Sequence, residues 1–439
     1  MHRTSKTTPA KVKNQMDSFE GEKSTQYEAF ARELVETCII SDPWVEGHER
    51  FRLEPVVLSR KEHEAFCHAI ESVGRAYAEM IGMLYNDSSL LDQSFYLTPW
   101  QRAMWIASGG AWHGIARADA FVLKDGSIRI CELNADTPSG EPEAVILNEV
   151  RHPFHPNLIN PNANFRDQFI GMVEASYRAT FGEKVVARPT LGIVYPTDIP
   201  EDLSMIELYR RWFQEKGWNV VLGSPYNLKR GDDGNLKMFG ERLHIVLRHY
   251  KTDWWGEREP VLYHDEEYLD PDPLDEPLQA ILGADVDGRV AVVNPFGAIL
   301  AQNKLAMAFF HKEIERFSSE SREAIRAYIP PTFRLCDVNR DTILAEKERW
   351  VLKSDFGCEG DEVMIGKLSE QDHWERIVAD AIPERWIVQE FFEAAADANE
   401  MIPNYGVFLI GGKAGGIFTR FSSASTDYRA VTAPTFVES

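Results

Sequence analysis

The sequence predicts a mixed α/β protein with α+β elements: an N-terminal helical segment, an open α/β domain, and a C-terminal part built mainly of strands. Amphipathic helices dominate the first part of the chain. Strand and helix patterns alternate between residues 190 and 250, which implies parallel strands in an open sheet. From Trp350 onward, short apolar runs are separated by glycine-containing turns, so this part is expected to consist of strands joined by tight turns.

The composition of the chain bounds the classes of function. The 439 residues are 44% hydrophobic and 26% charged, which is ordinary for a globular protein of two or three domains. The formal net charge of −22 argues against nucleic acid or an anionic membrane as a partner. A phosphate site would therefore have to be built locally from Lys, Arg, backbone N–H groups and metal.

The sequence also predicts a cytoplasmic setting. Its five cysteines are scattered without a Cys-x-x-Cys pair, which fits free thiols in a reducing compartment. Residues 1–13 are basic and polar with no apolar core, so they do not resemble a secretory signal. No stretch approaches the roughly 20 apolar residues of a membrane span.

Helices are expected after a tail that covers residues 1–24. The first helix begins near Gln26. The second opens at Ser59, where Ser-Arg-Lys-Glu forms a capping-box pattern, and its apolar face recurs with helical spacing over residues 66–84. A further helix is expected over residues 165–182.

The open α/β domain is expected to contain four strands and one helix. The strands cover residues 190–195, 218–222, 243–248 and 290–294, and the helix covers residues 203–216. This region lacks the glycine fingerprint of a dinucleotide site, so none is assigned. Residues 253–277, which are acidic and contain Pro and Trp, are expected to be a surface excursion. A helix over residues 302–317 follows and carries Lys304 near its start.

An Asp-Gly turn predicts a hairpin between residues 117 and 134. Asp125-Gly126 lies between two apolar runs, which is the strongest short-range signal for a hairpin and fixes its register. The expected cross-strand pairs are Lys124 with Ser127, Phe121 with Ile130, Asp119 with Glu132, and Arg117 with Asn134. By the two-residue period of a strand, Arg117, Asp119, Glu132 and Asn134 should share one face.

Two carboxylates that face each other across a hairpin repel. Such a pair is tolerated where a cation lies between the two groups. Two carboxylates and an amide oxygen are ligands that suit Mg2+ carrying the phosphates of a nucleotide. The alternative for Asp119 and Glu132 alone is the solvated end of a hairpin.

A second pattern points to phosphate binding. The strand over residues 350–353 ends in Lys353 and leads into a loop with Gly357 and Gly360, after which a strand over residues 363–365 follows. A Walker loop would lead into a helix, whereas a glycine flap between strands fits a different nucleotide clamp. The alternative is an exposed lysine beside an ordinary hairpin turn. Further strands are expected over residues 386–392, 405–410 and 416–420. The first of these contains Gln389 and Glu390, which could offer backbone groups to an adenine edge and a carboxylate to a ribose.

Together these segments resemble the glutathionylspermidine synthase family, a circularly permuted ATP-grasp group of carboxylate–amine ligases. The matching pieces are Arg117-x-Asp119, Cys131-Glu132-Leu133-Asn134-Ala135-Asp136-Thr137-Pro138, Asn303-Lys304, Val351-Leu352-Lys353, Val388-Gln389-Glu390-Phe391 and Gly415-Gly416-Ile417-Phe418-Thr419-Arg420. They span residues 100–439 in the order of the family. In an unpermuted ATP-grasp chain the metal-binding strands follow the nucleotide lysines, whereas here they precede them.

The resemblance implies a division of the chain and a set of site residues. Residues 25–185 would hold the helical region and the metal-binding half of the ATP-grasp fold, residues 186–300 a pre-ATP-grasp domain, and residues 301–439 the nucleotide-binding half. The implied cofactors are ATP and Mg2+. The implied residues are Asp119, Glu132 and Asn134 for Mg2+; Arg117 for catalysis on the transferring phosphoryl group; Lys304, Lys353, Gly357, Gly360, Gln389, Glu390 and Arg420 for ATP; and Ser139 and Glu143 for the substrate.

The implied reaction activates a carboxylate as an acyl phosphate, which an amine then attacks to give an amide, ADP and phosphate. The expected partners are a small-molecule carboxylate and an amine, and a homodimer is left open. The family usually has an arginine at the position of Cys358, and its loss removes a bidentate anion clamp. This departure makes glutathione a doubtful substrate. A non-catalytic ATP-binding protein and a small-molecule kinase are the alternatives.

Overall fold

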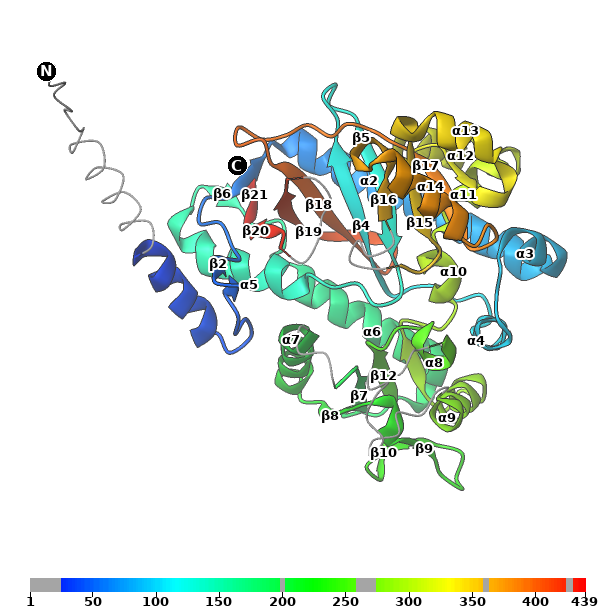
Figure 1. The fold of residues 1–439 in the computed structure, drawn as a ribbon. Helices are drawn as coiled ribbons and strands as arrows, with labels where there is room; N and C mark the ends of the chain where they lie inside the picture. The colour runs from blue at the N-terminus through cyan, green and yellow to red at the C-terminus, as the bar shows by residue number, and fades with distance from the viewer. Residues whose placement is uncertain (1–24, 198–201, 258–273, 358–362, 424–428) are drawn as a thin grey trace, which may run out of the picture.

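The computed structural model describes residues 25–197, 202–257, 274–357, 363–423 and 429–439 (Figure 1). A helix over residues 25–36 and the small hairpin of β1 (Trp44–Val45) and β2 (His48–Glu49) come first. Within the described ranges, no helix is both long and apolar enough to cross a membrane.

A five-stranded antiparallel sheet forms the centre of the larger lobe in Figure 1. Its strands in spatial order are β20 (Val431–Ala433), β19 (Lys413–Ser422), β18 (Ile402–Ile410), β4 (Ile115–Val122) and β5 (Ile128–Asn134). Strands from both ends of the chain therefore pair directly. The division at residue 300 stays a prediction, and this sheet combines strands from both sides of it.

Alternate residues of β18 enter two different cores. Val407 and Leu409 pack with helix α2 (Arg60–Asn86), and Phe408 and Ile410 pack with helix α6 (Phe165–Phe181). The two-residue period of a strand produces this division, so both faces of the sheet are covered. α2 begins with the predicted capping box, in which the Ser59 hydroxyl and the Glu62 carboxylate accept from each other's backbone N–H groups.

The predicted open α/β domain is confirmed as a four-stranded parallel sheet. Its order is β13 (Ala291–Val293), β12 (Ile245–Arg248), β7 (Thr190–Val194) and β8 (Asn219–Gly223). Helices α6 and α7 (Leu203–Glu215) cover one face, and α4 (Pro99–Ala107), α8 (Trp254–Glu257) and α9 (Asp275–Val286) lie on the other side. A small sheet of β9 (Leu228–Arg230), β10 (Leu236–Met238) and β11 (Glu241–Arg242) adjoins it. Most of the predicted excursion over residues 253–277 lies outside the described residues.

The third large sheet contains the predicted nucleotide strands. Its order is β14 (Thr332–Arg334), β17 (Trp386–Glu390), β15 (Trp350–Ser354) and β16 (Val363–Ile365). Helices α11 (Leu305–Lys312), α13 (Arg340–Ala345) and α14 (Gln371–Asp380) pack against it. Helices α10 (Ala298–Gln302) and α12 (Ser319–Tyr328) instead lie against β5 and α2. The remaining elements are α3 (Ser88–Ser94), α5 (Glu141–Arg151) and a sheet of β3 (Val56–Leu58), β21 (Thr435–Glu438) and β6 (Leu158–Ile159).

The predicted helix over residues 302–317 is wrong, because the chain breaks between α10 and α11. The Asn303 side chain accepts from the Leu305 N–H at 2.8 Å, at the start of the new helix. The Lys304 N–H donates to the Asp355 carbonyl at 3.0 Å instead of continuing α10. Asn side chains compete with helical hydrogen bonds in this way.

The β4–β5 hairpin has a different turn from the predicted one, yet it keeps the predicted acidic pair. Leu123 pairs with Ser127, so the loop has three residues, with Gly126 at φ +82°. Phe121 consequently faces Arg129, and its predicted pairing with Ile130 is wrong. A bulge that leaves Cys131 unpaired then restores the register, so Asp119 meets Glu132 and Arg117 meets Asn134 as predicted.

Candidate active site

The bulge at Cys131 is where the five-stranded sheet meets the sheet of β14, β15, β16 and β17. Its backbone carbonyl accepts a hydrogen bond from the Lys353 Nζ at 3.0 Å. Lys353 lies on β15, is 5% exposed, and also donates to the Gln389 Oε1 at 2.8 Å. The alternative of an exposed lysine beside a turn is therefore wrong. The two carbonyl-type acceptors stabilise the buried side chain of Lys353 at this junction.

Lys304 reaches the same junction from the break between α10 and α11. Its Nζ lies 3.3 Å from the Glu132 Oε1 and donates to the Gly357 carbonyl at 2.5 Å. In a continuous helix over residues 302–317, Asn303 would be helical, whereas its backbone is extended here and changes the direction of Lys304. The helix break therefore contributes directly to the site, because it directs the buried Lys304 side chain toward both Glu132 on β5 and the Gly357 carbonyl.

Asp119 lies between two arginines. Its Oδ1 accepts from the Arg117 Nε and its Oδ2 accepts from an Arg420 terminal nitrogen, both at 2.9 Å. The Asn404 amide approaches the Oδ2 at 3.4 Å. Burial alone would raise the pKa of Asp119, but the two guanidinium charges and these hydrogen bonds outweigh burial and lower it. Asp119 is therefore held as a carboxylate.

Arg117 is fixed at the opposite end by the loop that follows β5. A terminal guanidinium nitrogen donates to the Ser139 carbonyl at 2.6 Å and approaches the Ser139 hydroxyl at 3.4 Å. The next residue is Gly140, which has φ +106° and has no room for a Cβ beside Phe418. The glycine thus lets the loop pass close to the sheet and carry Ser139 to Arg117.

Four cations and two facing carboxylates meet at this place, in a chain whose overall charge is strongly negative. The cations are Arg117, Lys304, Lys353 and Arg420, and the carboxylates are Asp119 and Glu132. The local excess of positive charge suits a polyanionic ligand. The structure therefore brings together most of the residues that the resemblance implied for phosphate and metal.

The proposed Mg2+ ligands fit that ion by their chemistry. Asp119 and Glu132 are directly paired across β4 and β5, and Asn134 is paired with Arg117 two residues further along. They offer carboxylate and amide oxygens, and Mg2+ commonly takes its remaining ligands from water and substrate phosphates. In the part of the chain that the structure describes, no three His, Cys, Asp or Glu side chains gather as a metal site. Among the described residues, these side chains therefore do not form a metal site without ligands from water or substrate.

The remaining predicted site residues have other neighbours. The Gln389 side chain is buried and contacts Lys353 and Thr332. The Glu390 carboxylate pairs with Arg349 at 2.8 Å, and its N–H donates to the Pro331 carbonyl because β17 is a central strand. These backbone and side-chain groups are thus engaged within the sheet. Gly360 and Cys358 lie outside the described residues.

Glu143 lies on α5, the helix that follows Ser139. Its Oε1 pairs with Arg50 at 2.6 Å, and its side chain is 13% exposed. Arg50 comes from the segment before α2, so this pair connects the N-terminal region to α5. The structure therefore brings Ser139, but not the Glu143 carboxylate, into contact with Arg117. The substrate roles of both residues stay predictions.

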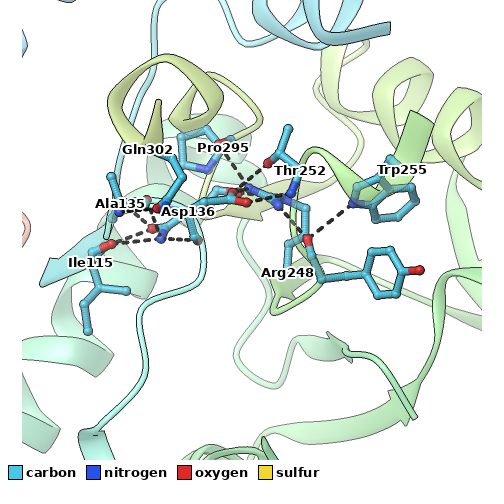
Figure 2. Close-up of polar contacts among 11 residues, drawn as sticks. Ile115, Ala135, Asp136, Arg248, Thr252, Trp255, Pro295 and Gln302 are labelled. Atoms are coloured by element: carbon cyan, nitrogen blue, oxygen red, sulfur yellow. Dashed lines mark hydrogen bonds and ion pairs between the residues drawn. The ribbon is translucent and has the colours of Figure 1, made fainter. Parts of the chain in front are cut away.

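The sequence did not predict a buried polar network around Asp136, which follows β5 (Figure 2). Asp136 pairs with Arg248 at the end of β12, and it accepts from the Thr252 N–H and hydroxyl, both at 2.6 Å. The Gln302 side chain accepts from the backbone N–H groups of Ala135 and Asp136. Polar residues at the carboxyl ends of parallel strands were the available signal, because ligand-facing groups concentrate there in open α/β sheets.

Glu141 was also missed, and it is fully buried at the start of α5. Its Oε1 accepts from the Tyr209 hydroxyl at 2.8 Å, and its Oε2 has no hydrogen-bond partner among the described residues. Burial is the main cause that raises the pKa of Glu141 to about 7, although Tyr209, His249 and Arg117 oppose the rise.

This raised pKa predicts a pH-dependent stability. The folded pKa of about 7 exceeds the ordinary value of 4.5, so the stabilising contribution of Glu141 is present below about pH 4.5 and is lost as the pH rises through 7. Relative to wild type, Glu141→Gln should become more stable by about 1.4 kcal/mol per pH unit across that window. Urea unfolding of both proteins at pH 5 and pH 8 measures this difference. A difference that does not change with pH would contradict it.

The fold and the clustered charges define a class of protein, an ATP-grasp-like synthetase fold with a cluster of cations at the junction of two sheets. A glutathione synthetase-like effector from Globodera pallida, solved in its apo form, has 13% identity to this chain and a TM-score of 0.59, with 94% of this chain and 96% of that chain covered. A candidate gamma-glutamylcysteine synthetase from Methylobacillus flagellatus KT has 12% identity and a TM-score of 0.45, with 87% and 88% covered. No curated protein sequence matches the chain.

The sequence places the chain more narrowly. Residues 97–438 match the family described as "Glutathionylspermidine synthase preATP-grasp". The chain belongs to the glutathionylspermidine synthase family, and the resemblance seen in the sequence is confirmed.

Proposed function

We propose that the protein is an ATP-dependent carboxylate–amine ligase that forms an amide through an acyl phosphate, with the ATP-grasp elements in permuted order. The observation that carries this proposal is the meeting of Arg117, Lys304, Lys353 and Arg420 with the facing carboxylates Asp119 and Glu132. Membership of the glutathionylspermidine synthase family supports the same reaction class.

The residues of this cluster have distinct roles in the proposed reaction. Lys304 and Lys353 hold phosphate oxygens from two sides of the junction, and Arg420 adds a third cation. Arg117, which is oriented by Asp119 and Ser139, neutralises the charge that develops on the transferring phosphoryl group. Phosphoryl transfer needs mainly positioning and charge neutralisation, so no protein nucleophile is required. Asp119, Glu132 and Asn134 would hold Mg2+, which supplies further charge neutralisation on the phosphates.

The acid substrate is proposed to be smaller or less anionic than glutathione. Cys358 stands where the family usually has an arginine, so one anion contact is lost. The amine is proposed to be cationic, because a chain with a net charge of −22 attracts a cation and raises its encounter rate. If glutathione and spermidine were the best substrate pair, the proposal on the acid would be wrong.

ADP release distinguishes the ligase from its alternatives. The purified protein is incubated with Mg-ATP and a panel of amino acids, peptides and polyamines, each alone and in pairs. A ligase releases ADP in quantity when an acid and an amine are both present, and mass spectrometry then shows an amide. ADP release with one substrate alone would indicate a kinase, and ATP binding without any release would indicate a binding protein.

Mg2+ and ATP should bind together more strongly than either binds alone. Three cations already contact Asp119 and Glu132, so free Mg2+ meets a site whose charge is balanced, whereas ATP brings the negative charge that makes room for it. At 100 times the Kd, Mg-ATP should stabilise the protein by about 2.7 kcal/mol. Thermal unfolding with Mg2+, ATP and both measures this, and in Glu132→Gln the gain from Mg2+ should be largely lost. Equal gains with and without Mg2+ would count against the metal assignment.

A further inference from the structure

A second polar site, around Glu141, lies next to the cation cluster. The cation cluster consists of Arg117, Lys304, Lys353 and Arg420. The loop that bonds Arg117 through Ser139 continues directly into Glu141, and Arg117 and Glu141 interact electrostatically. The side chain of Glu141 is fully buried, and its Oε2 has no hydrogen-bond partner among the described residues. Leaving a buried carboxylate oxygen unpaired costs free energy, so a donor from outside the chain would stabilise it.

A small cavity lies next to the side chains of Tyr209 and His249, both of which interact with this carboxylate. Its walls include Tyr209, which donates to Glu141, and His249, whose Nε2 lies 3.2 Å from the Asp202 carboxylate. The cavity volume that is open to the centre of a water molecule is about 20 Å3. One water needs roughly 10–15 Å3 by this measure, so the cavity accepts a single small polar group and excludes a tripeptide.

The unsatisfied group near this cavity is an acceptor, which selects the chemistry of the ligand. Arg248 and Asp136 also line the cavity, but they neutralise each other, and Asp136 has two further donors in Thr252. The Tyr209 hydroxyl already donates to Glu141. The Glu141 Oε2 is therefore the acceptor in this region that lacks a hydrogen-bond donor among the described residues. A primary ammonium group is water-sized, carries three donors and has positive charge.

We propose that Glu141, with Tyr209 and His249 beside it, forms the subsite for the ammonium group of the amine co-substrate. This inference rests on the proposed ligase function and adds to it the residue that receives the amine. The position is distinct from the phosphate cluster, yet it is joined to that cluster through Ser139 and Arg117.

The same residue completes the proton balance of the reaction. An ammonium group has no free electron pair, so it must lose one proton before it can attack. The Glu141 carboxylate accepts that proton, and the resulting amine attacks the carbonyl carbon of the acyl phosphate. The C–N bond forms, the C–O bond to phosphate breaks with its electron pair on oxygen, and the second N–H proton leaves with the phosphate. A general base is effective when its pKa lies near the working pH, and the pKa of Glu141 is raised to about 7.

The subsite is tested by direct binding of amines without turnover. Calorimetry with 1,4-diaminobutane and with its fully N-methylated quaternary analogue should show binding of the primary amine alone, because the methylated head group exceeds the cavity. Glu141→Gln should weaken binding of the primary amine at least tenfold and leave the Kd of Mg-ATP unchanged. Glu149→Gln, an exposed carboxylate on the same helix, is the matched control and should bind the amine as wild type does.

A second variant and a pH series keep the test independent of folding. Tyr209→Phe retains the carboxylate but removes its hydroxyl donor, and it should weaken amine binding less than Glu141→Gln does. Amine affinity in wild type should fall as the pH drops below 7, with Arg117, Tyr209, His249 and Asp202 as the other charged or titratable groups around Glu141. In Glu141→Gln this pH dependence should disappear. Unchanged amine affinity in folded Glu141→Gln, or equal binding of the quaternary analogue, would overturn the subsite.

The outcomes separate the subsite from the reaction. If ADP and amide form in wild type but the KM for the amine is unchanged in Glu141→Gln, the ligase proposal stands and the subsite is wrong. If the amine binds through Glu141 but no acid supports ADP release, the subsite stands and the ligase proposal fails.

Discussion

Replacing Lys353 by Met should reduce ADP formation by about 10²–10³-fold, the size of effect that follows removal of one preorganised donor to a developing anion. The Lys353 ammonium is buried at the junction of the two sheets and bonds the carbonyl of the bulge residue Cys131 and the amide oxygen of Gln389. Its side chain is therefore already held in position before a nucleotide arrives. Methionine has a similar length but no charge, so the Kd of ATP should rise with the loss of turnover. Equilibrium binding and steady-state ADP release measure the two effects.

Lys347→Met is the matched control for this variant. The Lys347 Nζ also bonds two carbonyls, those of Gly366 at 3.1 Å and Ser369 at 2.7 Å, and the residue directly precedes the same sheet. It contacts none of the residues of the cation cluster through these bonds. Both variants should lose comparable stability in urea, whereas loss of ATP binding should be confined to Lys353→Met. Equal ATP affinity in the two variants would show that Lys353 has a structural role alone.

Local patterns in the sequence were sufficient for the parts of the fold that depend on neighbours along the chain. The parallel sheet follows from strand and helix alternation over residues 190–250, and the start of α2 follows from the capping box at Ser59. The pairing of Asp119 with Glu132 was also predicted, but for an incomplete reason. The three-residue turn and the bulge at Cys131 each shift the register by one, and the two shifts cancel.

Contacts between distant residues determine the parts that the sequence did not predict. The apolar pattern runs on past Asn303 and Lys304, so it cannot reveal a break that depends on the carbonyl of Asp355. Glu141 stands in a Gly-Glu-Pro-Glu stretch that is typical of a solvent-exposed first helical turn. Its burial depends on Tyr209, which lies on α7 in the open α/β domain. The burial of the Glu141 carboxylate could for this reason not be predicted from the sequence alone.

Replacing Arg248 by Met should destabilise the protein by about 3–5 kcal/mol, the usual effect of removing one partner of a buried ion pair. The side chain of Arg248 is fully buried and that of Asp136 is 3% exposed (Figure 2). Arg248 also donates to the carbonyls of Asn294 and Tyr250, at 3.1 and 2.7 Å. Methionine leaves the Asp136 carboxylate with the two Thr252 donors but without a compensating charge. Chemical unfolding measures the loss, and Arg166→Met, which breaks a largely exposed pair with Glu215, should cost less than about 1 kcal/mol.

A double-mutant cycle distinguishes the ion pair from lost packing. If the penalty comes from the unpaired charge, Asp136→Leu combined with Arg248→Met should cost less than the sum of the single variants, because no charge then remains buried. Additive losses would show that Arg248 stabilises the protein through its other contacts. The pair also fixes the loop that leaves β5 to the end of β12, and that loop carries Ser139 and leads into Glu141 at the start of α5. Arg248→Met should therefore raise the KM for the amine even under conditions where the variant remains folded, although Arg248 lies outside the cation cluster around Asp119.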